Sequence, residues 1–422
     1  STPLYSSAAS DVYKRQAVRR LMIMNIAVAQ SGGPTCAINA SLVGVFKQAV
    51  KTPQIDAVFG SLNGIEGIIN DQLIDLKLVI KTNEDMELLR QTPSTVLGSC
   101  RYKLPDVEEG GETYERILNC LEKHRIEAFF YIGGNDSMDT VAKLSDYLAA
   151  RNSKIRVIGI PKTIDNDLPV TDHTPGFGSA AKYVAATVQE IIRDSSVYSI
   201  ESVTIVEIMG RHAGWLTAST CVLRANDEIA PHLIYLPENN FTAEKFLEDI
   251  RNQMAKHKAV IIAVSEGVKL KGEENKPRVV DNFGHEYLSG IGKTLEQLVK
   301  ENIGCKVRSI ELNVMQRCSS HICSKTDIDE AEEIGSAGVK AALAGKTGKM
   351  MIFKRISDVP YVVTVDSVDA HDAANKEKFF PAQWLSEDGN DVNPEAVRYF
   401  LPLIQGEVKI AMKNGMPVHF KL

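Results

Sequence analysis

One segment of the sequence brings a cation, a hydroxyl and two carboxylates together within seven positions. It reads Pro161-Lys-Thr-Ile-Asp-Asn-Asp167 and follows a short apolar run. Phosphoryl transfer needs this assortment, because a carboxylate takes the proton of a hydroxyl while a cation stabilises the moving phosphoryl group. A solvated loop of mixed charge is the alternative for the segment taken alone. We therefore treat Lys162, Thr163, Asp165 and Asp167 as candidate reactive residues.

Two glycine-rich turns offer places for phosphate. The first reads Ser31-Gly-Gly-Pro-Thr-Cys-Ala-Ile-Asn39 and the second Gly133-Gly-Asn-Asp-Ser137, each between an apolar run and an amphipathic segment. Consecutive backbone N–H groups at a helix start bind anions. Each signal alone is weak, since the first turn lacks the lysine of a P-loop and the second also fits a helix N-cap beside an acid. The Gly-Lys-Thr triplets at 292–294 and 345–347 lack the earlier glycine of a P-loop and are set aside.

The elements that must position these residues repeat one pattern, in which an apolar strand, a glycine turn and an amphipathic helix follow one another. The expected strands are 25–30, 127–132, 155–160, 203–208 and 259–264, and the expected helices include 40–50 and 138–149. Such repeats predict an α/β fold with mostly parallel sheets. Because the strands form two series, we expect two doubly wound, Rossmann-like domains facing one cleft, with ligands beyond the carboxyl ends of the strands.

Composition narrows the function classes. Of the 422 residues, 44% are hydrophobic and 24% are charged, which is typical of a globular protein with two or three domains. The net charge of −6, without a basic block, argues against nucleic acid as a partner. No apolar run approaches the ~20 residues of a membrane span, so we expect no membrane partner. Seven cysteines scattered singly predict a reducing compartment and therefore a cytoplasmic location.

Three local features have ordinary explanations. Residues 1–22 carry no periodicity, and we expect a disordered extension there. The basic residues and apolar run at 14–29 resemble a short signal peptide, but the glycine turn that follows favours a buried first strand. Cys318, His321 and Cys323 lie close together, yet no second pair stands at ligand spacing, so we do not expect zinc there.

Seven motifs, in their order and spacing, make the chain resemble the phosphofructokinase family from about Met24 to about residue 355. They are Ser31–Gly33, Leu97–Arg101, Gly133–Ser137, Pro161–Asp167, Met209–Arg211, Ser265–Gly267 and Gln316-Arg317. The resemblance implies an enzyme that phosphorylates the 1-hydroxyl of fructose 6-phosphate. A lipid or NAD kinase shares the Gly-Gly turn but not the segments at 163–167 and 209–211.

The resemblance also implies roles for single residues. Gly33, Gly134, Asp136 and Lys162 would bind the phosphoryl donor. The catalytic residues would be Asp165, Lys162, Arg101 and Asp136, with Asp165 as the base at the 1-hydroxyl and Arg101 at the transferred group. The residues implied to bind fructose 6-phosphate are Thr163, Ile164, Asp165, Asp167, Met209, Gly210, Arg211, Glu266, Arg308 and Arg317.

The identity of the phosphoryl donor is inferred from two positions. ATP-using relatives generally carry glycine where this chain has Asp136 and Lys162. An aspartate there would repel the α-phosphate of ATP, while the lysine would supply a cation to pyrophosphate. The pair therefore resembles the pyrophosphate-dependent branch. An ATP-dependent phosphofructokinase is the nearest alternative, and a non-catalytic phosphosugar-binding regulator is the alternative of another class.

The chain departs from the family at several positions. Asn135 stands where relatives have an acid associated with Mg²⁺, so the metal would arrive with pyrophosphate and meet Asp136, with Asn135 a weak ligand. Ser202 and Val314 stand where the family often has an arginine and a histidine around the 6-phosphate. Arg308 matches an arginine that, in relatives, crosses from a neighbouring subunit, which implies a homodimer or homotetramer.

The expected domain limits follow from the same motifs. Residues 23–175 with about 318–350 would form the donor-binding domain, and 176–317 the fructose 6-phosphate-binding domain. Residues 351–422 would pack on this core. The polar stretch 269–280 is expected to be a surface loop.

Overall fold

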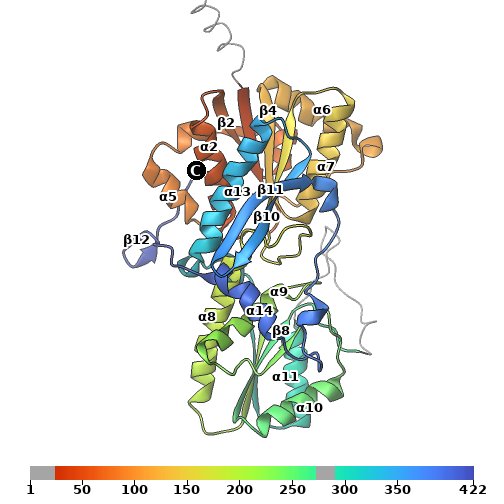
Figure 1. Cartoon of the computed structure of the whole chain (residues 1–422), viewed down its shortest axis with the longest axis vertical. Coiled ribbons are helices and arrows are strands. Elements are labelled where there is room, and N and C mark those ends of the chain that lie inside the picture. The colour runs from red at the N-terminus through yellow and green to blue at the C-terminus, as the bar shows by residue number, and fades with distance from the viewer. Residues whose placement is uncertain (1–23, 272–289) are drawn as a thin grey trace, which may run out of the picture.

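The structure is a computed structural model that describes residues 24–271 and 290–422. The expected extension at 1–22 lies outside these residues, as does most of the expected loop at 269–280. The described chain forms two main sheets that lie one beyond the other along the long axis of the molecule, each flanked by helices, and a separate two-stranded sheet of β12 and β13 (Figure 1).

The larger sheet has seven strands in the order β11-β10-β5-β4-β1-β2-β3. Its strands are β1 (Met24–Gln30), β2 (Ile55–Ser61), β3 (Leu73–Asp75), β4 (Ile126–Gly133), β5 (Arg156–Pro161), β10 (Lys349–Asp358) and β11 (Tyr361–Asp369). The central pairs are parallel, whereas the edge strands β3 and β11 pair antiparallel. The sequence beyond residue 348 therefore supplies two strands of the first sheet.

The central strands β1, β4 and β5 are buried on both faces, which explains their nearly continuous apolar runs. The helices on the two faces are α2 (Ile38–Val50) and α13 (Lys325–Leu343) on one side, and α3 (Ile65–Ile69), α6 (Val107–Lys123) and α7 (Asn135–Ala150) on the other. Val28 and Phe130 face the first pair of helices, while Ala29 and Phe129 face the second group. This alternation is the period of two that a strand imposes on its side chains.

The smaller sheet has four parallel strands in the order β7-β8-β6-β9. These strands are β6 (Ser202–Ile208), β7 (Leu233–Tyr235), β8 (Ala259–Ser265) and β9 (Lys306–Glu311), and the helices around them are α8 (Phe177–Ser196), α9 (Trp215–Ala218), α10 (Ala243–Met254) and α11 (Ile291–Asn302). Helices α10 and α11 cover one face, whereas α8 and α9 cover the other. Both sheets follow the predicted strand–turn–helix pattern, so the α/β fold class is confirmed.

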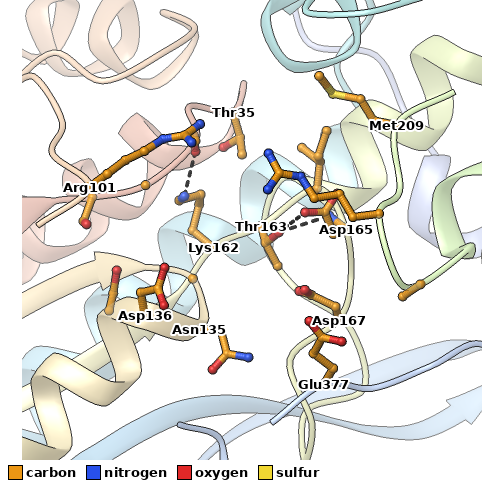
Figure 2. A pocket seen from close by; sticks show the side chains of 18 of the residues that line it. Thr35, Arg101, Asn135, Asp136, Lys162, Thr163, Asp165, Asp167, Met209 and Glu377 are labelled. Atoms are coloured by element: carbon orange, nitrogen blue, oxygen red, sulfur yellow. Dashed lines mark hydrogen bonds between the residues drawn. The ribbon is translucent and has the colours of Figure 1, made fainter. Parts of the chain in front are cut away.

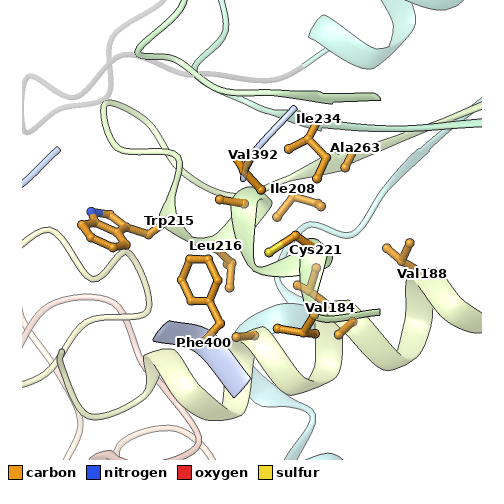
Figure 3. Close-up of a cluster of buried hydrophobic side chains, with 14 of the residues drawn as sticks. Val184, Val188, Ile208, Trp215, Leu216, Cys221, Ile234, Ala263, Val392 and Phe400 are labelled. Atoms are coloured by element: carbon orange, nitrogen blue, oxygen red, sulfur yellow. The ribbon is translucent and has the colours of Figure 1, made fainter. Parts of the chain in front are cut away.

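The C-terminal residues belong to both halves of the molecule. After β11, the chain runs to α14 (Pro394–Phe400), which packs into the core of the second sheet. Figure 3 shows Phe400 and Val392 among side chains of α8 and β6, including Val184 and Ile208. The predicted domain limits remain a prediction. In the structure, strand β10 runs across residue 351, where the C-terminal part is expected to begin.

The remaining described elements are short or lie at the surface. They are α4 (Leu76–Val79), α5 (Asn83–Arg90), α12 (Met315–Cys318), β12 (Met412–Lys413), β13 (Met416–Pro417) and the 3₁₀ segments Ser219–Asn226, Ser320–Ile322, Ala370–Asp372, Ala382–Trp384 and Leu401–Ile404. Among the helices at 24–271 and 290–422, none combines the length and apolar character that crossing a bilayer requires.

A buried ionic network around His173 joins the first sheet to the segment that follows the candidate residues at 162–167. His173 lies between two carboxylates, with Nδ1 2.8 Å from Asp172 Oδ2 and Nε2 2.7 Å from Glu330 Oε2. Its ring stacks on Phe353 at 4.6 Å. Burial alone would lower the pKa of His173, but the carboxylates of Glu330 and Asp172 outweigh it and raise that pKa to about 9. The imidazolium is therefore the form that this pocket stabilises.

We predict that replacing this cation weakens the fold in a pH-dependent way. A folded pKa above the unfolded one gives stabilisation that is complete below about pH 6.5 and is lost as the pH rises through 9. His173→Gln should cost about 3 kcal/mol near pH 6.5, since it leaves the buried carboxylate of Glu330 without its cation, while Asp172 keeps its ion pair with Arg355. Urea unfolding at several pH values measures this. The difference between wild type and variant should shrink toward pH 9.5, and a constant difference would contradict the assignment.

Candidate active site

A cavity of about 660 Å³ lies between the two sheets, at the carboxyl ends of their strands. The turns after β1, β4, β5, β6 and β8 contribute to its walls. The predicted site residues that line it are Gly33, Arg101, Gly134, Asn135, Asp136, Lys162, Thr163, Ile164, Asp165, Asp167, Met209, Arg211, Glu266 and Arg317. Two predicted residues, Gly210 and Arg308, do not line it.

Lys162 is the cation at the centre of the donor side. The side chain is only 2% exposed, and its Nζ donates a 2.7 Å hydrogen bond to the carbonyl of Gly33 (Figure 2). A side chain on Gly32 would reach within 3.2 Å of this Nζ, and the backbone of Gly32 is left-handed with φ +76°. Glycine is therefore needed at Gly32, because a Cβ would both strain the turn and crowd the lysine.

Three cations converge on the first glycine turn. A Cβ on Gly33 would lie 3.4 Å from Nη1 of Arg317, so the guanidinium lies against this glycine. Burial, together with the charges of Arg317 and Arg101, lowers the pKa of Lys162 to about 8, against the opposing effect of Asp165 and Asp167. Such mutual repulsion is relieved when an anion binds, so this side of the cavity is prepared for a polyanion.

The loop after β5 holds the candidate base. The backbone N–H of Asp165 donates to Thr163 Oγ1 at 3.1 Å, and that hydroxyl lies 3.4 Å from Asp165 Oδ2 (Figure 2). Burial raises the pKa of Asp165, while Arg211, Lys162 and the Thr163 hydroxyl act in the opposite direction. A carboxylate of raised pKa is a stronger proton acceptor than a solvated one, provided that it stays ionised.

Two further carboxylates stand near Asp165. Burial, Asp165 and then Glu377 raise the pKa of Asp167 to about 7. Burial also raises the pKa of Glu266 to about 7, although its Oε1 accepts a hydrogen bond from Gly210 N at 3.4 Å. The cavity thus has a cationic donor side and a carboxylate side that can bind hydroxyl groups, which suits a phosphate donor and a polyol acceptor.

The first turn of α7 forms the third wall. The amide Nδ2 of Asn135 donates to the carbonyl of Lys376 at 2.5 Å, whereas its Oδ1 is buried without a hydrogen-bond partner among the described residues. Asp136 is exposed beside it and lines the cavity. An unsatisfied buried oxygen and a neighbouring carboxylate are ligands of the kind that Mg²⁺ takes.

Gly210 and Arg308 lie outside the cavity wall for different reasons. Gly210 adopts φ +142° and stands directly behind the wall, where its carbonyl accepts a 2.6 Å hydrogen bond from Ser265 Oγ. Arg308 lies on the edge strand β9, and its Nη1 is 3.4 Å from Asp194 Oδ2. Its side chain is 40% exposed and does not line this cavity.

Comparison with known proteins agrees with these motifs. The family model described as Phosphofructokinase matches residues 25–341. A pyrophosphate–fructose 6-phosphate 1-phosphotransferase of Halomonas elongata is 39% identical over 407 residues, covering 94% of this chain and 96% of that protein.

The chain belongs to the phosphofructokinase family. Among solved structures, the pyrophosphate-dependent phosphofructokinase of Marinobacter aquaeolei is 36% identical, with a TM-score of 0.85 and coverage of 94% and 96% of the two chains. A sulfofructose kinase of Alkalicoccus urumqiensis is 32% identical over 373 residues, which cover 88% of this chain and 91% of that protein. The sequence resemblance to the family is confirmed.

A C-terminal segment that the motifs did not indicate also lines the cavity of this family member. We call residues 375–380 the strap; Asn375, Glu377 and Phe379 are its cavity-lining members. The strap carries no motif and no periodicity, and its contacts are with residues far away in the sequence. No sequence signal available in one chain could have placed it there.

The strap is fixed to both sides of the cleft. Toward the first sheet, Asn375 Nδ2 donates to Asp139 Oδ1 at 2.8 Å. Across the cleft, Glu377 Oε1 lies 2.9 Å from His212 Nδ1. The strap therefore bridges the donor wall and the loop after β6.

The loop at 163–167, which holds the candidate base, is also attached to the strap. The N–H of Lys378 donates to the carbonyl of Asp167 at 2.7 Å, and Trp215 Nε1 donates to the carbonyl of Lys378 at 2.8 Å. Figure 2 shows Glu377 next to Asp167, on the opposite side from Arg101. The strap thereby limits how far the loop at 163–167 can move.

We predict that Lys162 titrates within the neutral-to-alkaline range. Its pKa of about 8 means that the amine loses its proton, and becomes nucleophilic, as the pH rises through 8. Competitive acetylation followed by peptide mass spectrometry should show labelling of Lys162 with a midpoint near pH 8. The exposed Lys51 serves as the reference site in the same sample. Labelling of Lys162 that begins only near pH 10 would contradict the proposed environment.

Proposed function

We propose that this chain transfers a phosphoryl group from pyrophosphate to the 1-hydroxyl of fructose 6-phosphate, giving fructose 1,6-bisphosphate and phosphate. The observation that carries the proposal is the buried Lys162 at the Gly33 carbonyl, opposite the exposed Asp136 on α7. The relatives named as pyrophosphate-dependent enzymes support it at 36–39% identity. The reaction is reversible in principle, because both directions exchange one phosphoryl bond for another.

The donor would bind on the cationic side. Backbone groups of Gly33 and Gly134 would lie against its phosphates, with Lys162 and Arg101 over the transferred group. These charges would stabilise the transition state, in which negative charge spreads over the phosphoryl oxygens. Asp136 would repel the extra phosphate and the nucleoside of ATP, which is discrimination by an unfavourable contact.

The acceptor would bind on the carboxylate side. Thr163 and Ile164 would hold the reacting end of the sugar, while Met209, Gly210 and Glu266 would shape the pocket around its hydroxyls. Arg211 and Arg317 would bind the sugar and its 6-phosphate through their planar guanidinium forks. These roles follow from the family resemblance, and all of these residues except Gly210, which stands directly behind the wall, line the same cavity.

Asp165 would act as the base. It would take the proton of the 1-hydroxyl as the oxygen attacks phosphorus, and the proton would leave later with solvent. Asp167, whose pKa is about 7, would balance the charge of Asp165 and the neighbouring cations. Since both groups must stay ionised, activity should decline on the acidic side of neutrality.

A divalent metal suits this site, and we propose Mg²⁺. The oxygen atoms that fit it are Oδ1 of Asn135, which is buried without a partner among the described residues, and the carboxylate of Asp136. Mg²⁺ usually keeps several waters and binds through one or two protein oxygens together with phosphates. When bound, it would neutralise part of the pyrophosphate charge.

The position of Arg308 suggests that the protein assembles into a homo-oligomer. It lies on an edge strand, its side chain is partly exposed, and it does not line its own cavity, as expected of an arginine that reaches a second subunit. We therefore propose a homodimer or homotetramer in which Arg308 completes the site of a neighbouring copy. We also propose a cytoplasmic location, which the seven unpaired cysteines support.

Sulfofructose is a second candidate acceptor and should be tested in the same assay. The relative named sulfofructose kinase is 32% identical over 88% of this chain. The family's additional arginine and histidine around the 6-phosphate are replaced here by Ser202 and Val314. A sulfonate carries one charge where a phosphate carries nearly two, so fewer cations would suffice for sulfofructose.

The donor assignment predicts a clear preference in the wild type. Steady-state rates with fructose 6-phosphate should be high with pyrophosphate and negligible with ATP. Lys162→Gly alone should reduce pyrophosphate activity by the equivalent of about 3–4 kcal/mol in transition-state stabilisation. Asp136→Gly with Lys162→Gly should shift the preference toward ATP, because the repelling charge is gone.

These assays also separate the alternatives. Wild-type activity with ATP alone would favour the ATP-dependent alternative, and substrate binding without turnover under any donor would favour the regulator. A double variant that binds ATP no better than the wild type does would remove the donor role from these two residues.

The base assignment predicts a loss of turnover without a loss of binding. Asp165→Asn should lower kcat by roughly 10²–10⁴, which is the usual contribution of a positioned proton acceptor. Its affinity for pyrophosphate, measured by calorimetry, should change little. The control is Asp172→Asn, in the buried network around His173, which tests for a general disturbance of the loop at 163–167. Asn166→Asp is not a suitable control, because Asn166 is buried against Tyr399. Near-normal kcat in Asp165→Asn would exclude this residue as the base.

A further inference from the structure

A second cluster of metal-binding side chains lies away from the cleft. Asp71, Cys120 and His124 place one ligand atom each within 4.8 Å of one another. His124 Nε2 is 2.6 Å and Cys120 Sγ is 3.6 Å from the same oxygen, Oδ1 of Asp71. One carboxylate oxygen, one sulfur and one imidazole nitrogen therefore face a common point.

Local structure brings these residues together. Cys120 and His124 are four positions apart at the C-terminal end of α6, so they project from one face of the helix. Asp71 lies in the turn between α3 and β3, with a left-handed backbone at φ +57°. Aspartate is one of the few residues that tolerate this conformation. The turn therefore aims its carboxylate at the end of the helix.

Neighbouring groups fix the orientation of each ligand. Lys123 Nζ pairs with the other oxygen, Oδ2 of Asp71, and so leaves Oδ1 directed at Cys120 and His124. The ring of His124 packs edge-on against Phe59 at 5.4 Å, and its carbonyl accepts a 2.8 Å hydrogen bond from Asn25 Nδ2. Partners of this kind, which hold ligands in place, accompany most metal sites in proteins.

We propose that Asp71, Cys120 and His124 bind a divalent transition metal, most favourably Zn²⁺. Sulfur, imidazole nitrogen and carboxylate oxygen are the ligands that Zn²⁺ prefers, and its bond lengths of about 2.0–2.3 Å place tetrahedral ligand atoms roughly 3–4 Å apart. The Cys120–Asp71 contact already has this spacing, while the His124–Asp71 contact opens by roughly 0.5 Å on binding. Water occupies the fourth position, since Asp71 is partly open to solvent.

The charges balance in the metal-bound form. Binding releases the thiol proton of Cys120 to water, so that one thiolate and one carboxylate neutralise the dication. The side chain of Cys120 is only 4% exposed, which protects a bound metal–sulfur bond from solvent.

The site is structural rather than part of phosphoryl transfer. His124 precedes β4, whereas the cavity residues follow the other end of this eight-residue strand. At ~3.3 Å per residue, the strand separates the two sites by roughly 25 Å. None of the three ligands lines the cleft. Metal binding would join α6 to the turn before β3 and stabilise this edge of the first sheet, whatever the donor of the reaction proves to be.

Cobalt provides a direct test on the full chain, stripped of metal by chelator dialysis. Titration with Co²⁺ should produce one equivalent of a near-ultraviolet thiolate-to-cobalt band, and Cys120→Ala should abolish it. Cys305→Ala, which removes a cysteine in the other half of the molecule, should leave the band unchanged. Zn²⁺ at saturation should raise the Tm of the wild type by a few degrees and that of Cys120→Ala not at all.

The variants also separate this site from the cleft. The rate of phosphoryl transfer should be the same in Cys120→Ala and wild type, so a failure of the donor assignment would not affect the result. If Cys120→Ala does not fold by circular dichroism, His124→Asn decides instead, through loss of the Zn²⁺-induced rise in Tm. Cobalt bound without a thiolate band, or an equal Zn²⁺ effect in the ligand variants, would overturn the proposal.

Discussion

The cleft depends on a buried ammonium group. Lys162 is almost fully enclosed and has a single direct protein acceptor among the described residues, the carbonyl of Gly33. Taking a charge out of water is costly unless other groups compensate. The nearby carboxylates at 165 and 167 provide part of this compensation, while two arginines oppose it. A bound polyanion would complete the balance, so the same imbalance that lowers the pKa of the lysine creates affinity for a phosphate donor.

This balance requires that residues from distant parts of the chain keep their places. The parallel strands of the two main sheets direct their carboxyl ends toward one another, and each sheet has its own core on both faces. Helices α2 and α13 approach so closely that a Cβ on Gly44 would lie 2.0 Å from the carbonyl of Glu332. The position of the first glycine turn, which opens α2, is thereby coupled to the helix that follows Arg317. Packing behind the site thus sets the distance between its cations.

Local patterns in the sequence were sufficient to predict much of the fold and of the candidate site. The strand at 127–132 and the turn at 133–137 could be predicted because apolar runs and glycine turns report on neighbouring residues only. The cavity gathers most of the residues that the family motifs indicate, since those motifs follow strand ends. Glu377 could not be predicted, because its place depends on a contact with His212 across the cleft. The raised pKa of His173 likewise depends on Glu330, a partner 157 positions away.

The strap has a consequence for the synthesis of the chain. A ribosome makes the protein from its N-terminus, and domains generally begin to fold as they emerge. The strands that carry the glycine turns and the loop at 163–167 would be available early, but the strap at 375–380 emerges only after both main sheets have been made. Until then Asp167 lacks the backbone contact from Lys378, and Asn135 lacks the carbonyl of Lys376. A nascent chain therefore acquires a complete cleft in one of its last folding steps.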